Sequence, residues 1–257
     1  MIDLATIARY LDDLLRTAEI PDYPNAVNGI QLSNRSPIRR IAAAVDFSRR
    51  SIEAAIASDA NLLLVHHGMF WSGVQPLKGA QYDRLSLLMQ HDIAVYASHL
   101  PLDTHPAVGN NALLARALGL TAESGFARFQ TLDIGVQGTA SIPTETLAER
   151  ARAFAAQHGG NAVVTPIEPG RLTRRWAICT GAGAGADTLR EAAAGDIDTL
   201  IVGEGPHWTA VDGPEAGLAI IYAGHYATET LGVRALAAQL SDRFGVPHVF
   251  VEAPTGL

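Results

Sequence analysis

The chain has 257 residues, of which 48% are hydrophobic and 18% are charged, and its formal charge is -7 at pH 7. This length is enough for two compact α/β domains, and the apolar content must be buried within the fold or between subunits. The negative charge and the lack of a basic run argue against nucleic acid as a partner, because phosphate backbones are bound by clustered Lys and Arg.

Cysteine usage and the first residues bear on the cellular compartment. The single cysteine, Cys179, excludes an internal disulfide and a cysteine-based zinc cluster, which points to a reducing compartment. It lies in the apolar stretch AIC and is interpreted as an inert core thiol. The start, MIDLATIARYLDDLL, is too acidic for a signal peptide, and no apolar run reaches the roughly 18 residues of a membrane span. We therefore expect a cytoplasmic protein without membrane contact.

The predicted elements of the first half alternate between helix and strand. Apolar residues at helical spacing between Leu4 and Leu15 predict an opening helix that ends before the turn at Pro21 and Pro24. In chain order, the pattern then predicts a strand at 41–45, a helix at 48–58, a strand at 61–65, a helix near 83–90 and a strand at 93–97. Such alternation is typical of an α/β layered fold with buried, largely parallel strands.

The same layout occurs a second time along the chain. RIAAAVDFSRRSIEAAIASDANLLLVHHG, from residue 40, resembles RWAICTGAGAGADTLREAAAGDIDTLIVGEG, from residue 175, and both read as strand, turn, helix and strand. We interpret the chain as a duplicated α/β unit, with a first repeat over residues 1–125 and a second repeat over residues 126–257.

A histidine and an acid recur at the same spacing in both repeats. VYASHLPLD aligns without a gap with IYAGHYATE, so that His99 falls on His225 and Asp103 on Glu229, an offset of 126 in each case (225 minus 99 and 229 minus 103). The segment after His225 is predicted to be helical, which puts Glu229 on the same face one turn later. In the first repeat Pro101 predicts a loop that still brings Asp103 inward. The alternative for either motif alone is a helix-capping residue with a surface acid.

Two adjacent histidines, His66 and His67, follow the apolar strand NLLLV. In α/β sheets ligands bind at the carboxyl ends of the strands. Adjacent strand residues point to opposite faces, so both histidines face one site only if the backbone turns directly after the strand, which Gly68 permits. An isolated pair could equally be ordinary polar residues at a strand end, so the pair indicates a metal site only in combination with the other motifs.

Together these motifs supply five ligands for divalent metal ions: His66, His67, Asp103, His225 and Glu229. Neutral imidazole and ionised carboxylate are accepted by Zn, Fe, Mn, Co and Ni alike, so the sequence does not distinguish between them. We predict two ions, because a carboxylate between two cations offsets their repulsion while a shared water becomes acidic. Such a centre suits hydrolysis of a small molecule.

Other residues near these motifs have more than one interpretation. His99 is interpreted as a proton carrier beside the ligands, with direct metal binding as the alternative. Glu204, at the strand-end position equivalent to His67, is predicted to act as a base, with a capping or surface role as the alternative. TGAGAGAD lacks the ending of a phosphate-binding loop and predicts a sharp turn into a helix. Phe70 and Trp71 are interpreted as packing against the site, with stacking against a purine as the alternative.

The motifs taken together resemble the GTP cyclohydrolase 1 type 2 homologue family, also called the NGG-interacting-factor-three-like proteins. The resemblance runs in order through YPNAVNGIQLS, VHHGMFWSG, SHLPLDTHPAVGNNALLARALGL, IVGEGPHW and AGHYATETLGVRALA. It implies a duplicated three-layer α/β/α fold with mixed, largely parallel sheets, a dinuclear metal site and a ring-shaped homohexamer. Carried over by motif, the family's metal ligands fall on the five residues named above.

The resemblance also implies a function. It suggests a metal-dependent hydrolase whose substrate is a small molecule, and the family name suggests a purine nucleotide such as GTP. A fold and a metal site do not by themselves identify a substrate. The alternative, from a different class, is a non-catalytic metal-binding or metal-delivery protein that acts through protein partners.

Overall fold

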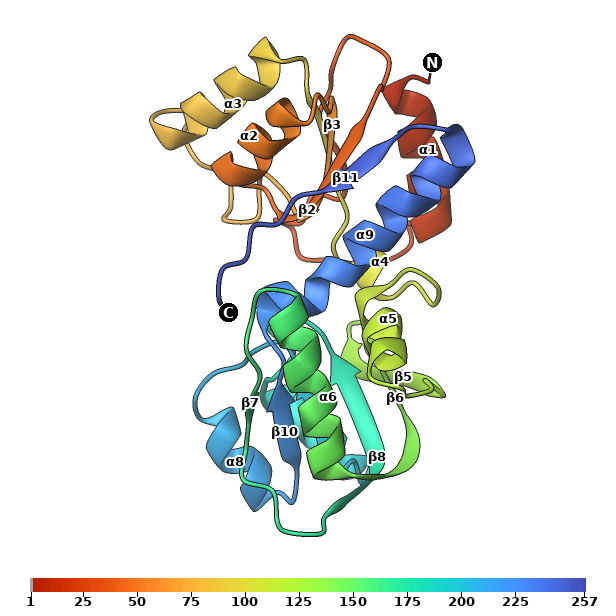
Figure 1. The fold of residues 1–257 in the computed structure, drawn as a ribbon, viewed down its shortest axis with the longest axis vertical. Helices are drawn as coiled ribbons and strands as arrows, with labels where there is room; N and C mark the ends of the chain where they lie inside the picture. Colours follow the sequence, from red (N-terminus) through yellow and green to blue (C-terminus); the bar gives the residue numbers. More distant parts are fainter. Residues whose placement is uncertain (1) are drawn as a thin grey trace. The chain divides into compact units, whose positions relative to one another are not determined.

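The computed structural model describes residues 2–257, which form two compact units (Figure 1). Unit 1 comprises the described chain up to Leu102 together with Gly232–Ala253, and unit 2 comprises Asp103–Leu231 together with Pro254–Leu257. These boundaries differ from the repeats expected at 1–125 and 126–257. The last strand and most of the last helix belong to unit 1, because that strand pairs with the first sheet.

Unit 1 is built on a five-stranded sheet in the order β1-β4-β3-β2-β11. Its strands are β1 (Gly29–Leu32), β2 (Ile41–Asp46), β3 (Leu62–His67), β4 (Ala94–Ala97) and β11 (His248–Phe250). Only β1 runs antiparallel to its neighbour. The central strands are apolar up to their last one or two residues because both of their faces are covered. The three strands predicted in this unit are confirmed apart from small shifts at their ends, whereas the sequence pattern does not predict β1 and β11.

Helices cover both faces of this sheet, as Figure 1 shows. They are α1 (Leu4–Leu15), α2 (Arg49–Ala57), α3 (Ala80–Gln90) and the later part of α9 (His225–Phe244). α2 begins where the sequence predicts, because the side chain of Ser48 caps its first turn. Ile52 of α2 and Leu88 of α3 pack on one face of the sheet. On the other face α1 meets α9, where the rings of Tyr10 and Phe244 pack edge to face.

Unit 2 is built on a six-stranded sheet in the order β5-β6-β8-β9-β10-β7. Its strands are β5 (Ser124–Phe129), β6 (Leu132–Pro143), β7 (Val163–Val164), β8 (Leu172–Cys179), β9 (Thr199–Val202) and β10 (Ala219–Tyr222). β8, β9 and β10 are parallel, and the remaining pairings are antiparallel. Three parallel strands therefore form the centre of each sheet, in agreement with the repeated strand, helix and strand pattern.

The helices of unit 2 also lie on both faces of their sheet. They are α5 (Asn110–Ala117), α6 (Thr144–Gln157), α7 (Ala186–Ala194), α8 (Thr209–Glu215) and the first turns of α9. Phe154 of α6 packs against Trp176 on one face, and Leu189 of α7 packs against Leu200 on the other. The predicted mixed α/β fold is thereby confirmed. Within residues 2–257, no helix combines the length and the apolar character needed to cross a bilayer.

Strand register shows which residues of the two sheets correspond. Val65 of β3 faces α2 and Val202 of β9 faces α7, the helix at the equivalent place, so these valines correspond at an offset of 137 (202 minus 65). The same offset matches Glu204 with His67 (204 minus 67). The predicted equivalence of these two strand-end residues therefore holds in the sheets.

The ungapped alignment of the two His-x-x-x-acid motifs is wrong by one residue. The partners of the two valines on the next strands are Ala97 and Tyr222, an offset of 125 (222 minus 97) rather than 126. At this offset His225, which opens α9, corresponds to Leu100, which opens the short helix α4 (Leu100–Asp103). His99 instead precedes its helix by one residue. Because a one-residue shift redirects a side chain, His99 and His225 are not structurally equivalent.

The segment around Pro101 is one helical turn and not the predicted loop. Pro101 is the second residue of α4, where a backbone N–H would have no intrahelical partner, so its missing donor does not disturb the turn. The amide of Leu102 donates to the backbone oxygen of His99 at 2.9 Å. Asp103 ends this turn and is buried, as expected.

The sheet core predicts a stability difference between two leucines. Replacement of the fully buried Leu63 by Ala should lower the free energy of unfolding by about 2–5 kcal/mol, because it leaves a cavity between α2 and the sheet. Leu77 is 66% exposed, and Leu77→Ala should change this free energy by less than about 0.5 kcal/mol. Urea unfolding followed by circular dichroism measures both, and equal losses would contradict the assignment of the core.

Candidate metal centre

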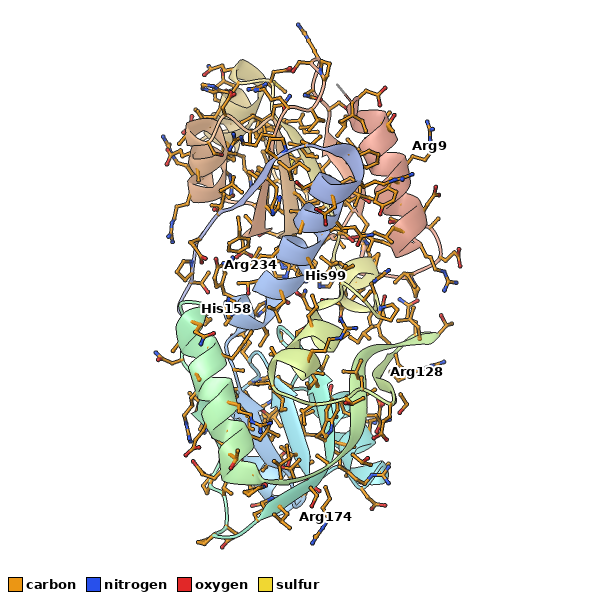
Figure 2. All side chains as sticks on the ribbon, turned by 45° about the vertical axis from the view of Figure 1, so that its right-hand side comes forward. Arg9, His99, Arg128, His158, Arg174 and Arg234 are labelled. Carbon is orange, nitrogen blue, oxygen red and sulfur yellow. The ribbon has the colours of Figure 1, made fainter. Side chains whose placement is uncertain are left out.

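β3 ends in two buried histidines, His66 and His67, which continue the strand where the sequence predicts a turn. Their rings still lie together, with centroids 4.8 Å apart and planes at 50°. His99, on the segment between β4 and α4 (Figure 2), completes the group, since one ring nitrogen of each histidine lies within 4.8 Å of the others. All three side chains are buried. Unit 1 therefore contains a cluster of imidazoles that could bind a metal ion.

An oxygen atom orients each ring of the histidine pair through its Nδ1. Nδ1 of His66 lies 2.9 Å from the backbone oxygen of Ser98, and Nδ1 of His67 lies 2.9 Å from Oδ1 of Asp46. Carbonyl and carboxylate oxygens only accept, so Nδ1 carries the proton and donates it. Nε2 then keeps the lone pair with which a neutral imidazole binds a metal ion.

His99 is held in the same way by a buried carboxylate. Its Nδ1 lies 2.8 Å from Oδ1 of Asp22. Burial by itself would raise the pKa of Asp22. This pKa is nevertheless lowered, because Asp22 accepts a hydrogen bond from His99, is attracted by its charge, and accepts further bonds from Asn28 and the amide of Tyr23. Asp22 is therefore an ionised acceptor at neutral pH, and the lone pair of His99 is again on Nε2.

In unit 2 His225 and Glu229 stand one turn apart at the start of α9. Nε2 of His225 lies 3.2 Å from Oε2 of Glu229, and its Nδ1 lies 2.8 Å from Oε1 of Glu204. Burial lowers the pKa of His225, but the hydrogen bonds and charges of Glu229 and Glu204 outweigh it and raise the pKa to about 9. Glu204 thus orients His225 as Asp46 orients His67.

Asp103 is held by two buried asparagines that the motif reasoning misses. Asn110 donates from Nδ2 to Oδ1 of Asp103 at 2.8 Å. Asn111 donates to the backbone oxygen of Asp103 at 3.3 Å and accepts from the amide of Thr180 at 2.9 Å. Adjacent asparagines form helix poorly, so their place at the start of α5 is the signal that could have identified them.

The TGAGAGAD loop brings the backbone close to these ligands and then turns into α7, as predicted. Gly181 has φ of +62°, and a Cβ there would lie 2.2 Å from Oε1 of Glu229 and 3.4 Å from Nε2 of His225. Both the positive φ and the close approach of Glu229 favour glycine at this position. Burial raises the pKa of the neighbouring Cys179 thiol to about 12, with the charges of Asp103 and Glu229 contributing, which agrees with an inert core thiol.

Comparison with known proteins identifies the family. The model of the Duf34/NIF3 (NGG1p interacting factor 3) family matches residues 2–255. The chain belongs to this family. The proteins named GTP cyclohydrolase 1 type 2 homolog from Deinococcus radiodurans and Halobacterium salinarum are 43% and 41% identical to it. These alignments cover 98% of this chain and 93% of the first relative, and all of both chains for the second.

Solved structures share the fold over the full length of this Duf34/NIF3 chain. The crystal structure of TTHA1606 from Thermus thermophilus matches with a TM-score of 0.87 at 35% identity. The protein ybgI, of unknown function, matches with a TM-score of 0.88 at 30% identity. Both matches cover 100% of both chains. The family resemblance found in the sequence motifs is therefore confirmed.

Aromatic side chains of this Duf34/NIF3 protein lie against the histidine cluster of unit 1. The ring centroid of Trp71 lies 4.6 Å from that of His67 and 4.4 Å from that of His99. Tyr23 meets Trp71 edge to face at 6.5 Å and is 49% exposed. Trp71 therefore packs on the cluster, as predicted, while part of the Tyr23 ring stays accessible.

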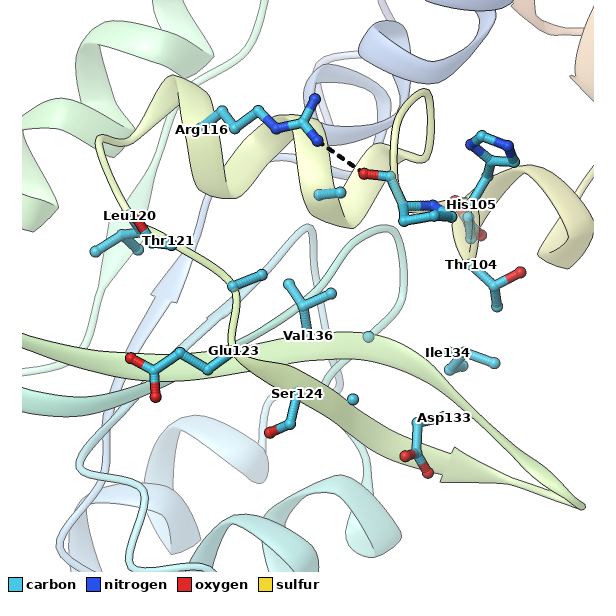
Figure 3. A pocket seen from close by; sticks show the side chains of 16 residues that line it. Thr104, His105, Arg116, Leu120, Thr121, Glu123, Ser124, Asp133, Ile134 and Val136 are labelled. Carbon is cyan, nitrogen blue, oxygen red and sulfur yellow. Dashed lines mark hydrogen bonds between the residues drawn. The ribbon is translucent and has the colours of Figure 1, made fainter.

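A cavity of about 610 Å³ in unit 2 extends to Asp103 (Figure 3). Its walls come from the segment after α4, from α5 and from the β5–β6 hairpin. Arg116 of α5 donates to the backbone oxygen of Pro106, and Nδ1 of His105 accepts from the amide of Val108. Burial lowers the pKa of His105, which favours its neutral form. One predicted ligand is therefore bordered by a space large enough for a small molecule.

Two glycines of the TGAGAGAD loop offer a matched test of this geometry. Gly181→Ala should lower the free energy of unfolding by about 1–3 kcal/mol, because its positive φ and the contact with Glu229 oppose a Cβ. Gly185→Ala should cost less than about 1 kcal/mol, since a Cβ there meets no atom within 4 Å. Denaturant unfolding with EDTA present measures both, and a smaller loss for Gly181→Ala would contradict the close approach.

Proposed function

We propose that this chain is a metal-dependent hydrolase of a small molecule, in which His66, His67, Asp103, His225 and Glu229 hold two divalent ions. The observation that carries the proposal is the orientation of the three histidines, each of which has Nδ1 paired with an oxygen atom and presents Nε2. The names of relatives such as the Deinococcus radiodurans homolog, which refer to a cyclohydrolase, support a hydrolytic reaction.

The donor set suits borderline ions such as Zn, Fe, Mn, Co or Ni, because it joins neutral imidazole nitrogens with carboxylate oxygens. The histidine pair of unit 1 and the His225 and Glu229 pair of unit 2 each offer fewer donors than a complete coordination shell. When bound, two such ions would polarise the substrate and make a water molecule between them more acidic.

Two residues beside the ligands are proposed to move protons. His99 has its Nδ1 proton committed to Asp22, so its Nε2 can accept a proton from the attacking water and return it to the leaving group. Direct metal binding by His99 is the alternative, because its nitrogen lies within 4.8 Å of those of His66 and His67. Glu204 is proposed as a second proton acceptor, since its side chain is 39% exposed while Oε1 holds His225.

A planar heteroaromatic substrate, such as a purine nucleotide, is the candidate that the surroundings support. The exposed part of the Tyr23 ring lies beside His99, with ring centroids 6.0 Å apart, and offers a stacking surface. GTP is the first compound to test because of the names that the relatives carry. Stacking alone does not select one base over another, so the test uses a panel of substrates.

We further propose a cytoplasmic homohexamer, as the family resemblance implies. The exposed apolar side chains of Val74 and Met89, which are 87% and 67% exposed, support burial against another subunit. The competing function is a non-catalytic metal-binding or metal-delivery protein that acts through protein partners. That function needs the same ligands, so metal content alone does not separate it from a hydrolase.

Metal content and turnover measured on the same preparation test the proposal. We expect two ions per chain and hydrolysis of GTP or of another compound from a nucleotide and phosphoester panel. His99→Ala and Glu204→Gln should retain the metal while kcat falls about 10²- to 10⁴-fold, because proton transfer is lost.

Two outcomes would count against parts of this proposal. Full metal occupancy without turnover of any compound would exclude the hydrolase and favour metal delivery. A double variant, His225→Ala with Glu229→Ala, that still held two ions tightly would exclude the ligand assignment.

The carboxylate that orients His67 provides a separate prediction. Asp46→Ala should weaken metal binding about 10- to 100-fold, because the ring of His67 loses the acceptor for its Nδ1 proton. Asp59→Ala is the matched control, since Asp59 pairs with the exposed Arg39 on the surface of the same unit. Competitive titration with a chromophoric chelator measures both affinities. Equal affinities would show that Asp46 does not support a metal ligand.

A further inference from the structure

A buried carboxylate in the loop between α1 and β1 contacts the histidine cluster. The side chain of Asp22 is 6% exposed and accepts four hydrogen bonds. Oδ1 accepts from the amide of Tyr23 at 2.7 Å and from Nδ1 of His99 at 2.8 Å. Oδ2 accepts from Nδ2 of Asn28 at 2.8 Å and from the amide of Leu100 at 2.9 Å. Asp22 thereby joins this loop to both the side chain of His99 and the backbone that follows it.

The YPNAVNGIQLS motif strengthens the same connection. Oδ1 of Asn28 accepts from the amide of His99 at 2.8 Å, so Asn28 holds Asp22 and His99 at once. Three residues later, Oε1 of Gln31 accepts from the amide of Met69 at 2.6 Å, on the loop that carries Trp71. Asn28 and Gln31 thus hold the backbone beside the histidine cluster, whereas Tyr23 of the same motif is the proposed stacking surface.

We propose that Asp22, held in place by Asn28, is a positioning residue that fixes His99 in its Nδ1–H tautomer. The ring of His99 then presents Nε2 toward the cluster, where its centroid lies 4.9 Å from that of His66 and 5.7 Å from that of His67. A neutral imidazole that is free to rotate would divide its population between two tautomers and several orientations. The effect of Asp22 on turnover rests on the proposed function, whereas its effect on the tautomer does not.

A purely structural role for Asp22 is the competing explanation, and the chain offers a control for it. Asp92 in the same unit also ties a loop together, because it accepts from the amides of Arg35 and Ser36 at 2.8 and 2.9 Å. These bonds involve no histidine. Asp92→Ala should therefore reproduce the loss of loop anchoring without changing His99.

The test is nitrogen NMR of the histidine rings in the full chain, labelled at its nine histidines and freed of metal with EDTA. The signals of His99 are assigned by their loss in His99→Gln. At pH 8 we expect wild type and Asp92→Ala to show His99 as a single Nδ1–H tautomer. Asp22→Ala should show both tautomers, Asn28→Ala an intermediate mixture, and Asp22→Glu a return toward the single tautomer.

Several results would overturn the positioning role. An Nε2–H tautomer for His99 in wild type would do so even if Asp22→Ala did not fold. The positioning role would also be excluded if folded Asp22→Ala kept the wild-type tautomer of His99, or if Asp92→Ala changed that tautomer as much as Asp22→Ala does. The expected tautomers in a protein without hydrolase activity would leave the positioning role intact and count only against the proposed function.

Discussion

The candidate centre depends on a property of imidazole: one nitrogen can bind a metal ion or accept a proton only when the proton sits on the other nitrogen. In this protein each of four histidines has Nδ1 within 2.9 Å of an oxygen atom that can accept that proton. These four acceptors come from different segments of the chain. They are the backbone oxygen of Ser98 and the carboxylates of Asp46, Asp22 and Glu204. The fold therefore fixes which nitrogen of each ring is paired with these oxygen acceptors.

The parallel sheets explain how these acceptors reach the histidines. Asp46 is the last residue of β2 and lies directly across from His67, the last residue of β3. Ser98 follows β4, the next strand, and its carbonyl reaches His66. In unit 2 Glu204 follows β9 and meets His225 after β10. Parallel strands end at the same edge of a sheet, so residues distant in sequence converge there without any need for the strands themselves to be polar.

The two repeats have diverged in how they present a histidine, and strand register makes this visible. In unit 2 His225 is the first residue of a long helix, so Glu229 follows on the same face. In unit 1 His99 precedes a single turn and depends on Asp22, which lies outside the repeated segment. The His-x-x-x-acid spacing looks symmetric in sequence, yet the sheets match at an offset shorter by one residue. Sequence comparison does not detect this shift, because β4 and β10 are apolar on both faces and either alignment pairs apolar residues with apolar residues.

The sequence by itself determined the mixed α/β class, the family, the apolar strand before the two histidines and the helix that carries Glu229. Each of these leaves a local pattern of apolar residues or a compact motif. Only the tertiary structure decided which oxygen orients each ring, that Asn110 and Asn111 hold Asp103, and that the last strand completes the first sheet. Those features join segments far apart in the chain through single hydrogen bonds or strand pairings. Such contacts depend on the fold as a whole, and no short window of sequence records them.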